Sequence, residues 1–332
     1  MTMAKIGDSK QPYQILEERW AKYIGTNEAV AVSSGTAGLH LAVRALGIGP
    51  GDEVIVPDFG MIATAWAVSY CGAKPVFADC RRDFGIDGGE IKKKITSKTK
   101  AIIITHLYGR PVYETIPICG LGIPVIEDAC EAHGATIVGR KVGTFGVLAV
   151  FSLYRNKIIQ SEEGGLVNTN YDDLADEIRD LKSMAFGHTH DYYHRTVGFN
   201  YRITNMQAQC AINELDFIDM HLFGRKEWAD RLDRELGRFV LPRPAGSVIW
   251  VYDMVMDDQG QRDRVLEVLK KNGIEARPFF KPMSTQPMYA GAEVEVGKNA
   301  LEFSQRGLYL CYQKKWKKKE VDKTIKIIKE NL

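Results

Sequence analysis

The stretch AVAVSSGTAGLHL, Ala29–Leu41, joins a short apolar run to a helical pattern through a turn that contains serine and glycine. The run Ala29–Val32 is continuously apolar, which predicts a strand buried on both faces. The helix predicted over Thr36–Leu46 begins with backbone N–H groups that lack partners, and its dipole adds positive potential there, which suits a phosphate. The same residues would equally serve as an ordinary helix cap, so the turn alone leaves both interpretations open.

Similar apolar runs recur through the first two-thirds of the chain and alternate with helical patterns. Strand, helix and strand repeated in this way predict an α/β fold, with a mostly parallel mixed sheet flanked by helices. The further predicted strands are 54–57, 75–78, 101–105, 124–127, 147–152 and 165–168, and the helices between them are 61–70 and 88–95.

The pattern changes after residue 174. Helices are predicted over 174–182 and 204–222, followed by a strand (248–256), a helix (260–272), a short strand (274–277) and a final helix (319–332). Apolar residues share one face of that final helix: Val321, Ile325, Ile328 and Leu332. We therefore predict a large domain over 1–223, with an N-terminal helix and the central sheet, and a smaller C-terminal α/β domain over 224–332.

The composition is that of an ordinary globular protein of 332 residues, 45% of them apolar and 26% charged. Lysine and arginine number 44 against 42 aspartate and glutamate, which argues against a disordered chain and against a nucleic-acid-coating domain. The six cysteines are scattered, which predicts reduced thiols and no metal site. No apolar run matches a signal peptide or a membrane span, so we expect a cytoplasmic protein without membrane contact.

Two polar side chains follow strands that are predicted to end at one edge of the sheet, where α/β proteins bind ligands. Asp128 follows the apolar run at 124–127 and is either the N-cap of the next turn or the anionic partner of a protonated heteroaromatic nitrogen. Lys157 lies on the loop after 147–152, which would hold it over the same edge. Most single lysines are solvated, but a partly desolvated lysine is more easily deprotonated, as Schiff-base chemistry requires.

A further polar pair lies in GFNYRITNMQAQ, 198–209. Asn200 and Arg202 precede the expected helix cap at Thr204. An ordinary turn explains them structurally, and a clamp on an anion explains them functionally.

Taken in order, these stretches resemble the pyridoxal 5′-phosphate (PLP)-dependent nucleotide-sugar aminotransferases, which share the aspartate aminotransferase fold (fold type I). The resemblance runs from about Ile15 to the C-terminus. It implies PLP as cofactor, with pyridoxamine 5′-phosphate as its aminated form, and a homodimer with composite active sites. The motifs that carry it are SSGTAGLHLAV, EVIVPDFGMIATAWAV, KPVFAD, HLYGRP, VIEDACEAHGA, FSLYRNK, EEGGLV, GFNYRITNMQAQ and RPFFKPM.

The resemblance also implies roles for individual residues. Lys157 stands where the family carries the lysine that binds PLP as a Schiff base, and Asp128 where an aspartate pairs with the pyridinium nitrogen. Glu131 falls at a position near the cofactor ring and its 3′ oxygen, and Asn200 at that of an asparagine that reaches the phosphate from the partner subunit. Further residues expected at the cofactor phosphate are Gly35, Thr36, Ala37 and Ser152.

The implied reaction moves an amino group from L-glutamate to C4 of a nucleotide-linked 4-keto-6-deoxyhexose. Segments 131–132, 190–200 and 277–282 resemble the perosamine-forming branch of the family, which favours a GDP-linked sugar and leaves UDP- and dTDP-linked sugars as alternatives. For each lone histidine near the expected substrate, an ordinary structural role fits equally well. The expected substrate-side residues are His106, Tyr108, His188, His194, Arg202 (at the donor carboxylate) and Arg277.

Two departures from the family pattern leave a catalytically idle paralogue as an alternative. The family usually stacks an aromatic residue on the pyridine ring four positions after Pro57, where this chain has Met61; a thioether can also pack on a ring face, and Phe59 is the other candidate. Family members also usually begin with a longer segment that includes a glycine-rich loop. Two other enzyme classes are disfavoured: the dehydratase branch has histidine in place of Lys157, and a dinucleotide-dependent oxidoreductase needs G-x-G-x-x-G after the first strand.

Overall fold

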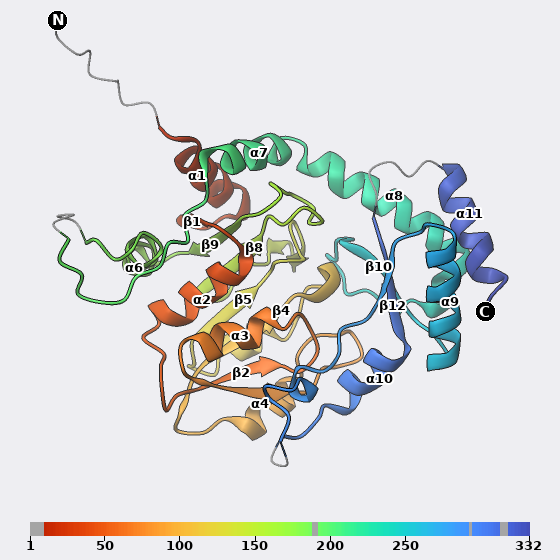
Figure 1. Ribbon diagram of the computed structural model, residues 1–332, viewed down its shortest axis with the longest axis horizontal. Helices are drawn as coiled ribbons and strands as arrows, with labels where there is room; N and C mark the ends of the chain where they lie inside the picture. The colour runs from red at the N-terminus through yellow and green to blue at the C-terminus, as the bar shows by residue number, and fades with distance from the viewer. Residues whose placement is uncertain (1–9, 188–191, 292–293, 313–317) are drawn as a thin grey trace, which may run out of the picture.

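A seven-stranded sheet forms the centre of the computed structural model, which describes residues 10–187, 192–291, 294–312 and 318–332 (Figure 1). The strands β2, β3, β4, β5 and β8 run parallel to their neighbours among themselves, whereas β9 runs antiparallel to both β1 and β8. The predicted mostly parallel α/β fold is therefore confirmed. In spatial order the strands are β1 (Glu28–Val32), β9 (Gly165–Thr169), β8 (Leu148–Ser152), β5 (Val125–Asp128), β4 (Thr99–Thr105), β2 (Glu53–Pro57) and β3 (Lys74–Ala78).

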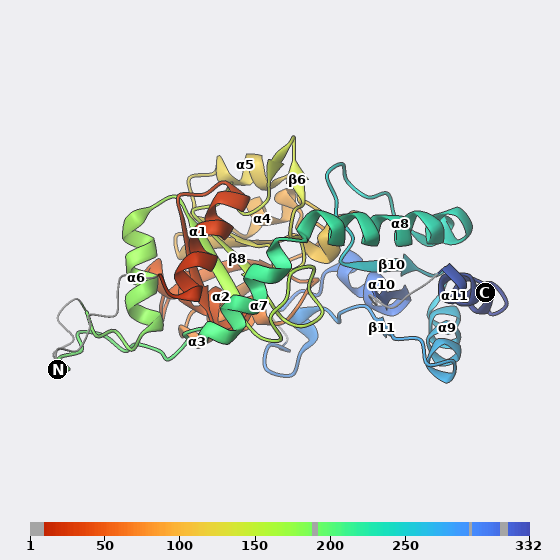
Figure 2. The ribbon, with the colours of Figure 1, turned by 90° about the horizontal axis from the view of Figure 1, so that it is seen from above.

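Helices cover both faces of this sheet (Figures 1 and 2). The strand β1 shows why: Val30 and Val32 join one apolar cluster and Ala29 and Ala31 the other, because successive side chains of a strand point to opposite faces. The first cluster holds α2 (Gly35–Ala45), α3 (Ala63–Tyr70) and α6 (Asp172–Lys182), and the second holds α1 (Pro12–Ile24) and α7 (Asn205–Leu215). The helices α4 (Gly88–Lys94) and α5 (Thr115–Cys119) pack near β2 to β5 in a third cluster.

The single helix predicted over 204–222 is wrong, because the chain forms two helices there. The helix α7 ends at Leu215, Phe217 has non-helical dihedral angles (φ −113°, ψ 14°), and α8 (Ile218–Leu236) then runs through the predicted domain division at 223/224. The break lets the two helices bury different faces. The α7 helix packs on α1, whereas α8 buries Trp228 and Leu232 in the core of a second sheet.

The second sheet has three antiparallel strands in the order β10 (Val251–Val255), β12 (Gly307–Cys311) and β11 (Ala276–Pro278). It shares one apolar cluster with α8, α9 (Gln259–Lys271) and α11 (Lys318–Lys329), which includes the predicted face Val321, Ile325 and Ile328. The central strand β12 and the preceding α10 (Lys298–Arg306) were not predicted, and neither was the small hairpin of β6 (Thr136–Ile137) and β7 (Arg140–Lys141).

Two further features concern the cysteines and the lengths of the helices. All six cysteines have free thiols. None of the helices in the described ranges is long and apolar enough to cross a membrane.

Candidate active site

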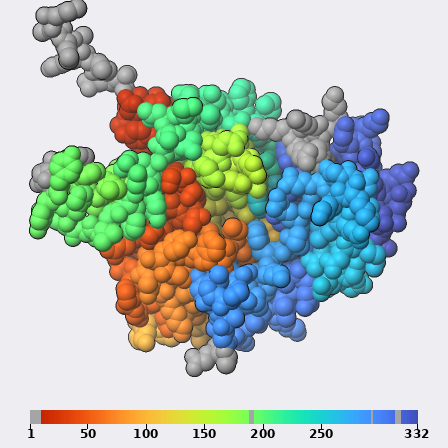
Figure 3. Space-filling model, in the orientation of Figure 1, coloured from red at the N-terminus to blue at the C-terminus, as the bar shows by residue number. Residues whose placement is uncertain are grey.

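A cavity of about 780 Å³ opens at the carboxyl edge of the first sheet, where residues of the second sheet face it. Its walls come from the start of α2, the ends of β5 and β8, the loop after β8 and the strands β11 and β12. In Figure 3 the yellow-green segment that follows β8 lies at the centre of the visible face, between red and orange segments from the start of the chain and blue segments from its last third. The lining brings together most of the predicted cofactor residues: Gly35, Thr36, Met61, Asp128, Glu131, Ser152 and Lys157.

The start of α2 supplies the cavity with backbone N–H groups. Ser34 caps the helix by accepting a hydrogen bond from the N–H of Ala37 at 3.0 Å, whereas the N–H groups of Gly35 and Thr36 precede any helical acceptor. A β-carbon on Gly35 would lie 3.0 Å from both the Cβ of Ser152 and the Sγ of Cys130, so glycine lets the helix start sit against β8. Ala37 was also predicted to lie at the cofactor phosphate. Its N–H already donates to Ser34, and its side chain does not line the cavity.

Asp128 ends β5 and presents its carboxylate to the cavity. Its Oδ2 accepts a hydrogen bond from the Thr64 hydroxyl on α3 at 2.9 Å, and its Oδ1 accepts one from the N–H of Cys130 at 3.2 Å. The residue is 4% exposed. A carboxylate this buried is stabilised by facing a cation or a further donor, which the cavity has room to hold.

Lys157 and Glu131 form an ion pair in the same cavity. The Nζ of Lys157 lies 3.4 Å from the Oε1 of Glu131, and the Oε2 of Glu131 accepts the N–H of Tyr108 at 3.0 Å. Burial raises the pKa of Glu131, although the positive charge of Lys157 and the Tyr108 hydrogen bond oppose this shift. The lysine side chain is only 10% exposed, so it is not a solvated surface group.

Residues 6–329 match the DegT/DnrJ/EryC1/StrS aminotransferase family. The chain belongs to this family. It is therefore an aminotransferase, and an amine and two carboxylates in one cavity are consistent with that activity.

Individual relatives cover most of the aminotransferase. It is 42% identical over 288 residues to a GDP-perosamine synthase of Caulobacter vibrioides, which covers 82% of this chain and 77% of that protein. A GDP-perosamine synthase of Vibrio cholerae is 36% identical over 306 residues, covering 89% of this chain and 83% of that one. Among solved structures, S. venezuelae DesV in complex with a ketimine intermediate has a TM-score of 0.87 at 31% identity, with 97% of this chain and 89% of that chain covered.

The predicted ring-stacking residues occupy different environments in the aminotransferase. Met61 lines the cavity and is 46% exposed, so its thioether is free to contact a bound ring. Phe59 is fully buried between Phe84, Phe279 and Phe303 and does not line the cavity. Phe59 as an alternative stacking residue is therefore ruled out by its packing.

Two predicted substrate-side residues are structural. The ring of His106 is fully buried, with Nε2 3.0 Å from Glu127 and Nδ1 accepting the N–H of Val112 at 3.1 Å. Tyr108 is 1% exposed and packs in the aromatic cluster beside the cavity, with Phe279 and Phe280. Neither residue lines the cavity, because the end of β4 turns both side chains into the core.

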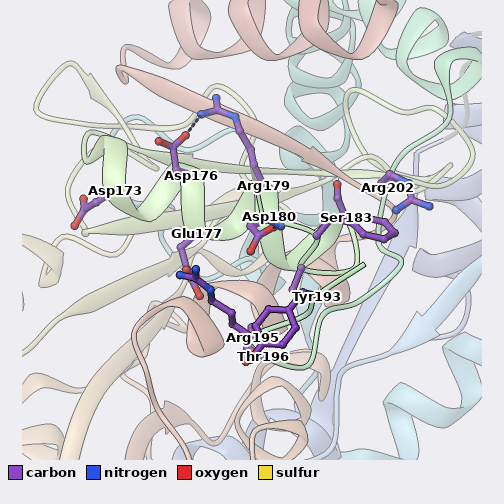
Figure 4. Close-up of a pocket in the computed structure, with 13 residues that line it drawn as sticks. Asp173, Asp176, Glu177, Arg179, Asp180, Ser183, Tyr193, Arg195, Thr196 and Arg202 are labelled. Atoms are coloured by element: carbon purple, nitrogen blue, oxygen red, sulfur yellow. Dashed lines mark hydrogen bonds and ion pairs between the residues drawn. The ribbon is translucent and has the colours of Figure 1, made fainter. Parts of the chain in front are cut away.

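The segment after α6 places other predicted residues away from the cavity. Asn200 is exposed and pairs through its backbone with Ser183, and His194 contacts the carbonyl of Met184. Arg202 lines a separate, larger hollow of about 970 Å³ beside α6, in which charged side chains such as Asp176 and Arg179 pair with one another (Figure 4). That hollow holds neither of the predicted catalytic residues. His188 lies outside the described residues.

The second sheet contributes cavity residues that the sequence pattern missed. Arg277 was predicted and lines the cavity, where it pairs with Glu275 at 3.0 Å. Trp250 and Arg155 were not predicted, although Arg155 lies two residues before Lys157 in the quoted motif FSLYRNK. Trp250 stands 93 positions after Lys157, so no local spacing in the sequence indicates that the two residues line one cavity. Other aromatic lining residues are Tyr154, Phe280, Tyr309 and Tyr312.

Proposed function

We propose that this aminotransferase uses PLP, bound through Lys157, to transfer the amino group of L-glutamate to C4 of a GDP-linked 4-keto-6-deoxyhexose. The observation that carries the proposal is the placement of the Lys157 amine, the Asp128 carboxylate and the open start of α2 around one cavity. The names of the relatives support the cofactor and the substrate: two are GDP-perosamine synthases, and one is a putative pyridoxal phosphate-dependent aminotransferase of Bacillus subtilis, 33% identical over 314 residues.

The cavity residues fit the three functional ends of PLP. An aldehyde needs an amine with little competing solvent, which Lys157 offers. A protonated ring nitrogen needs a buried anion, which Asp128 offers, and a phosphate needs unpaired N–H groups at a helix start, which Gly35 and Thr36 offer together with the Ser152 hydroxyl. When bound, PLP supplies an electron sink for the charge that develops at the donor Cα.

The residues of the chain then have distinct tasks. Lys157 would hold the cofactor, and its amine, once released, would take a proton from the Cα of the amino donor at Nζ and, as a general acid, give it to the carbon that carried the aldehyde. Asp128 keeps a negative charge at the ring nitrogen. Glu131 lies 3.4 Å from Nζ and therefore orients the amine between its two tasks.

Two guanidinium groups in the wall of the cavity, which also holds the carboxylates of Glu162, Glu163 and Glu275, support an anionic substrate. Arg155 and Arg277 both line the cavity. L-Glutamate and a nucleoside diphosphate sugar each carry two or more negative charges that guanidinium groups bind well. The GDP-linked sugar is favoured over UDP- and dTDP-linked sugars because the two perosamine synthases carry that nucleotide in their names.

A homodimer with shared sites is also part of the proposal. Asn200 is exposed and lies outside the cavity of its own chain, as expected for a residue that reaches the phosphate in a partner. Exposed apolar side chains on α7 and around the start of α8 offer a surface to a second copy: Met206, Phe217, Met220 and Phe223. Free thiols throughout support a cytoplasmic location.

The test begins with the purified protein and added PLP. We expect a visible absorption band that glutamate bleaches, that is absent in Lys157→Ala, and that is unchanged in the control Lys226→Ala, whose side chain is 70% exposed on α8. GDP-, UDP- and dTDP-linked 4-keto-6-deoxyhexoses are then offered with glutamate, and the products are identified by mass spectrometry. No band would contradict the cofactor assignment, and amination of a UDP- or dTDP-linked sugar alone would contradict the nucleotide.

A further inference from the structure

The amine of Lys157 lies on the face of an indole ring. Its Nζ is 3.9 Å from the centroid of the Trp250 ring and 3.4 Å from the Oε1 of Glu131. Trp250 is 4% exposed, and the lysine side chain is 10% exposed. The ammonium group is therefore enclosed between an aromatic face and a carboxylate, a position in which a cation–π contact is stronger than at an exposed site.

Trp250 is fixed to the loop that carries the lysine. It lies directly before β10, in the region of the second sheet, and its Nε1–H donates to the carbonyl of Asn156 at 2.9 Å. Asn156 is the residue before Lys157, so this bond ties the indole to the backbone of the lysine loop. The ring also stacks near Tyr108, at 6.1 Å between centroids and 21° between planes.

Arg225 of α8 bonds to the backbone of both Trp250 and Lys157. Its Nη1 donates to the carbonyl of Trp250 at 2.6 Å, and its Nη2 lies 3.5 Å from the carbonyl of Lys157. The side chain is 4% exposed, and its guanidinium carbon lies 4.4 Å from the centroid of the Tyr312 ring. Burial lowers the pKa of Arg225 to about 10, and bonds to carbonyl oxygens offset part of the cost of burying this charge.

We propose that Trp250 is a positioning residue that holds the released amine of Lys157 between its indole face and Glu131, and that Arg225 locks Trp250 to the lysine loop. The proposal rests on the proposed function, in which the amine is covalently engaged for part of the cycle and free for the rest. A free lysine has four rotatable side-chain bonds, so without a docking face its amine would sample positions from which it cannot reach the donor Cα.

A role of Trp250 in packing alone predicts a different experimental result. If Trp250 only filled the aromatic cluster, a change in the charge distribution of its ring would leave the reactivity of Lys157 unchanged. If the indole face holds the amine, weakening that face makes the amine more reactive, because the amine reacts as a nucleophile only when it is free to reach the reagent.

The experiment uses the full chain without cofactor and measures acylation of Lys157 by an amine-reactive ester at fixed pH, followed by peptide mass spectrometry. Acylation of Lys226, 70% exposed, provides the internal reference. We expect Trp250→Leu to raise the rate at Lys157 about tenfold, and Trp250→Phe, which keeps a weaker aromatic face, to raise it less. The control Trp228→Phe removes another buried tryptophan, 5% exposed in the core of the second sheet, and is expected to leave the rate unchanged.

A second measurement covers the case in which Trp250→Leu does not fold. The chain is produced with fluorinated tryptophan, which keeps the shape of the indole but weakens its negative face. We expect faster acylation of Lys157 than in the unmodified chain, and no such change when the same substitution is made in Trp250→Phe. Acylation at the original rate in folded Trp250→Leu or in the fluorinated chain would overturn the proposal.

Arg225 is tested in the same assay. Arg225→Lys keeps a donor to the Trp250 carbonyl, whereas Arg225→Met removes both donors, so only the methionine variant is expected to acylate faster at Lys157. Because no PLP and no amino donor are present, these outcomes are independent of the absorption and product assays that decide the proposed function. In the PLP-loaded enzyme, Trp250→Leu and Arg225→Met are expected to lower kcat and leave the KM for glutamate within about twofold, whereas Arg225→Lys is expected to keep kcat near the original value.

Discussion

Glu127 and Asp128 are neighbours on β5, yet their carboxylates have different surroundings. Asp128 faces the cavity and Thr64. Glu127 is fully buried behind it, where it accepts hydrogen bonds from the ring of His106 and from backbone N–H groups at 143, 145 and 146. Because successive side chains of a strand point to opposite faces, the carboxylate of Glu127 stabilises the fold, whereas that of Asp128 is available to a ligand.

The first prediction concerns Glu127. Burial by itself would raise the pKa of Glu127, but the hydrogen bond from His106 and those from the N–H groups of Gly146 and Gly143 lower it overall. Since the folded pKa lies below the unfolded value of about 4.3, the ionised carboxylate adds stability above that pH, and this contribution is lost as the pH falls through the folded pKa. We expect Glu127→Gln to lower the free energy of unfolding at pH 7 by about 2–4 kcal/mol.

Denaturant titrations from pH 7 down to pH 3 measure this effect. The difference between the original chain and Glu127→Gln is expected to narrow below about pH 4.3. The exposed Glu163→Gln is the matched control and is expected to unfold like the original chain at every pH. A gap that stays constant through this range would contradict the assignment of an ionised Glu127.

The second prediction concerns Asp128. Asp128→Asn keeps the shape and leaves the Thr64 hydroxyl a partner, but removes the negative charge from the cavity. We expect kcat to fall about 100-fold to 1,000-fold because a charge that favours the transition state is lost, while the thermal midpoint changes little. Thr64→Val, which removes only the hydroxyl bonded to Asp128, is the control and is expected to cost far less activity. Full activity in Asp128→Asn would show that this carboxylate does not face the reacting group.

At the residue scale, the sequence predicted the cofactor residues of the cavity better than it predicted the residues that contact the substrate. Lys157, Asp128 and Glu131 lie close to strand ends, so their place on the sheet follows from the strand pattern. His106 also follows a strand, but its ring turns inward because the carboxylate of Glu127 is already buried there. A residue whose direction depends on a partner on another strand is not predictable from local sequence.

At the element scale, the strands of the first sheet follow from their apolar runs, whereas β12 did not. The segment Gly307–Cys311 follows α10 directly, and its first residue, Gly307, is the only turn residue at the junction. It is nevertheless the central strand of its sheet, paired with both β10 and β11. Its conformation is set by these partners, which are far away in sequence, and local propensity alone does not indicate it.

The third prediction concerns the packing of α2 on the first sheet. A β-carbon at Gly38 would lie 2.8 Å from the Cγ1 of Val150 and 3.2 Å from the Cγ2 of Val167, and valine side chains have little freedom to move. Gly38→Ala gains about 1 kcal/mol of helix propensity but overpacks the core by about 1–3 kcal/mol, so we expect a net loss of about 1 kcal/mol.

A glycine in open space provides the control for Gly38. Gly237 at the end of α8 has φ −56°, and a β-carbon there would meet no atom closer than 3.9 Å. Gly237→Ala is expected to raise the free energy of unfolding by about 0.5 kcal/mol. Urea titrations of both variants compare the two helices directly. A stabilised Gly38→Ala would show that α2 moves away from the sheet at little cost.

At the scale of the whole molecule, two carboxylates dock the segment that leads from β11 into α10 on the edge of the first sheet. Asp58, after β2, accepts hydrogen bonds from the N–H and hydroxyl of Ser284 and from the N–H of Gly297. Asp79, after β3, accepts the N–H groups of Asn299 and Ala300 at the start of α10. Parallel strands end at the same edge, so this edge both lines the cavity and holds the second sheet in place.

The last prediction tests this docking. Burial raises the pKa of Asp58, although its hydrogen bonds to Ser284 and Gly297 oppose the shift. Asp58→Asn places an amide nitrogen where Oδ2 accepted the N–H of Gly297, which leaves that N–H without an acceptor. We expect faster hydrogen exchange at 283–291 and 297–300 and unchanged exchange in β4 and β5. Asp83→Asn, on the loop after β3, is the control and is expected to exchange like the original chain. Because Phe280, at the start of the same segment, lines the cavity, Asp58→Asn should also weaken PLP binding, and faster exchange with intact PLP binding would mean that the cavity forms without this segment held in place.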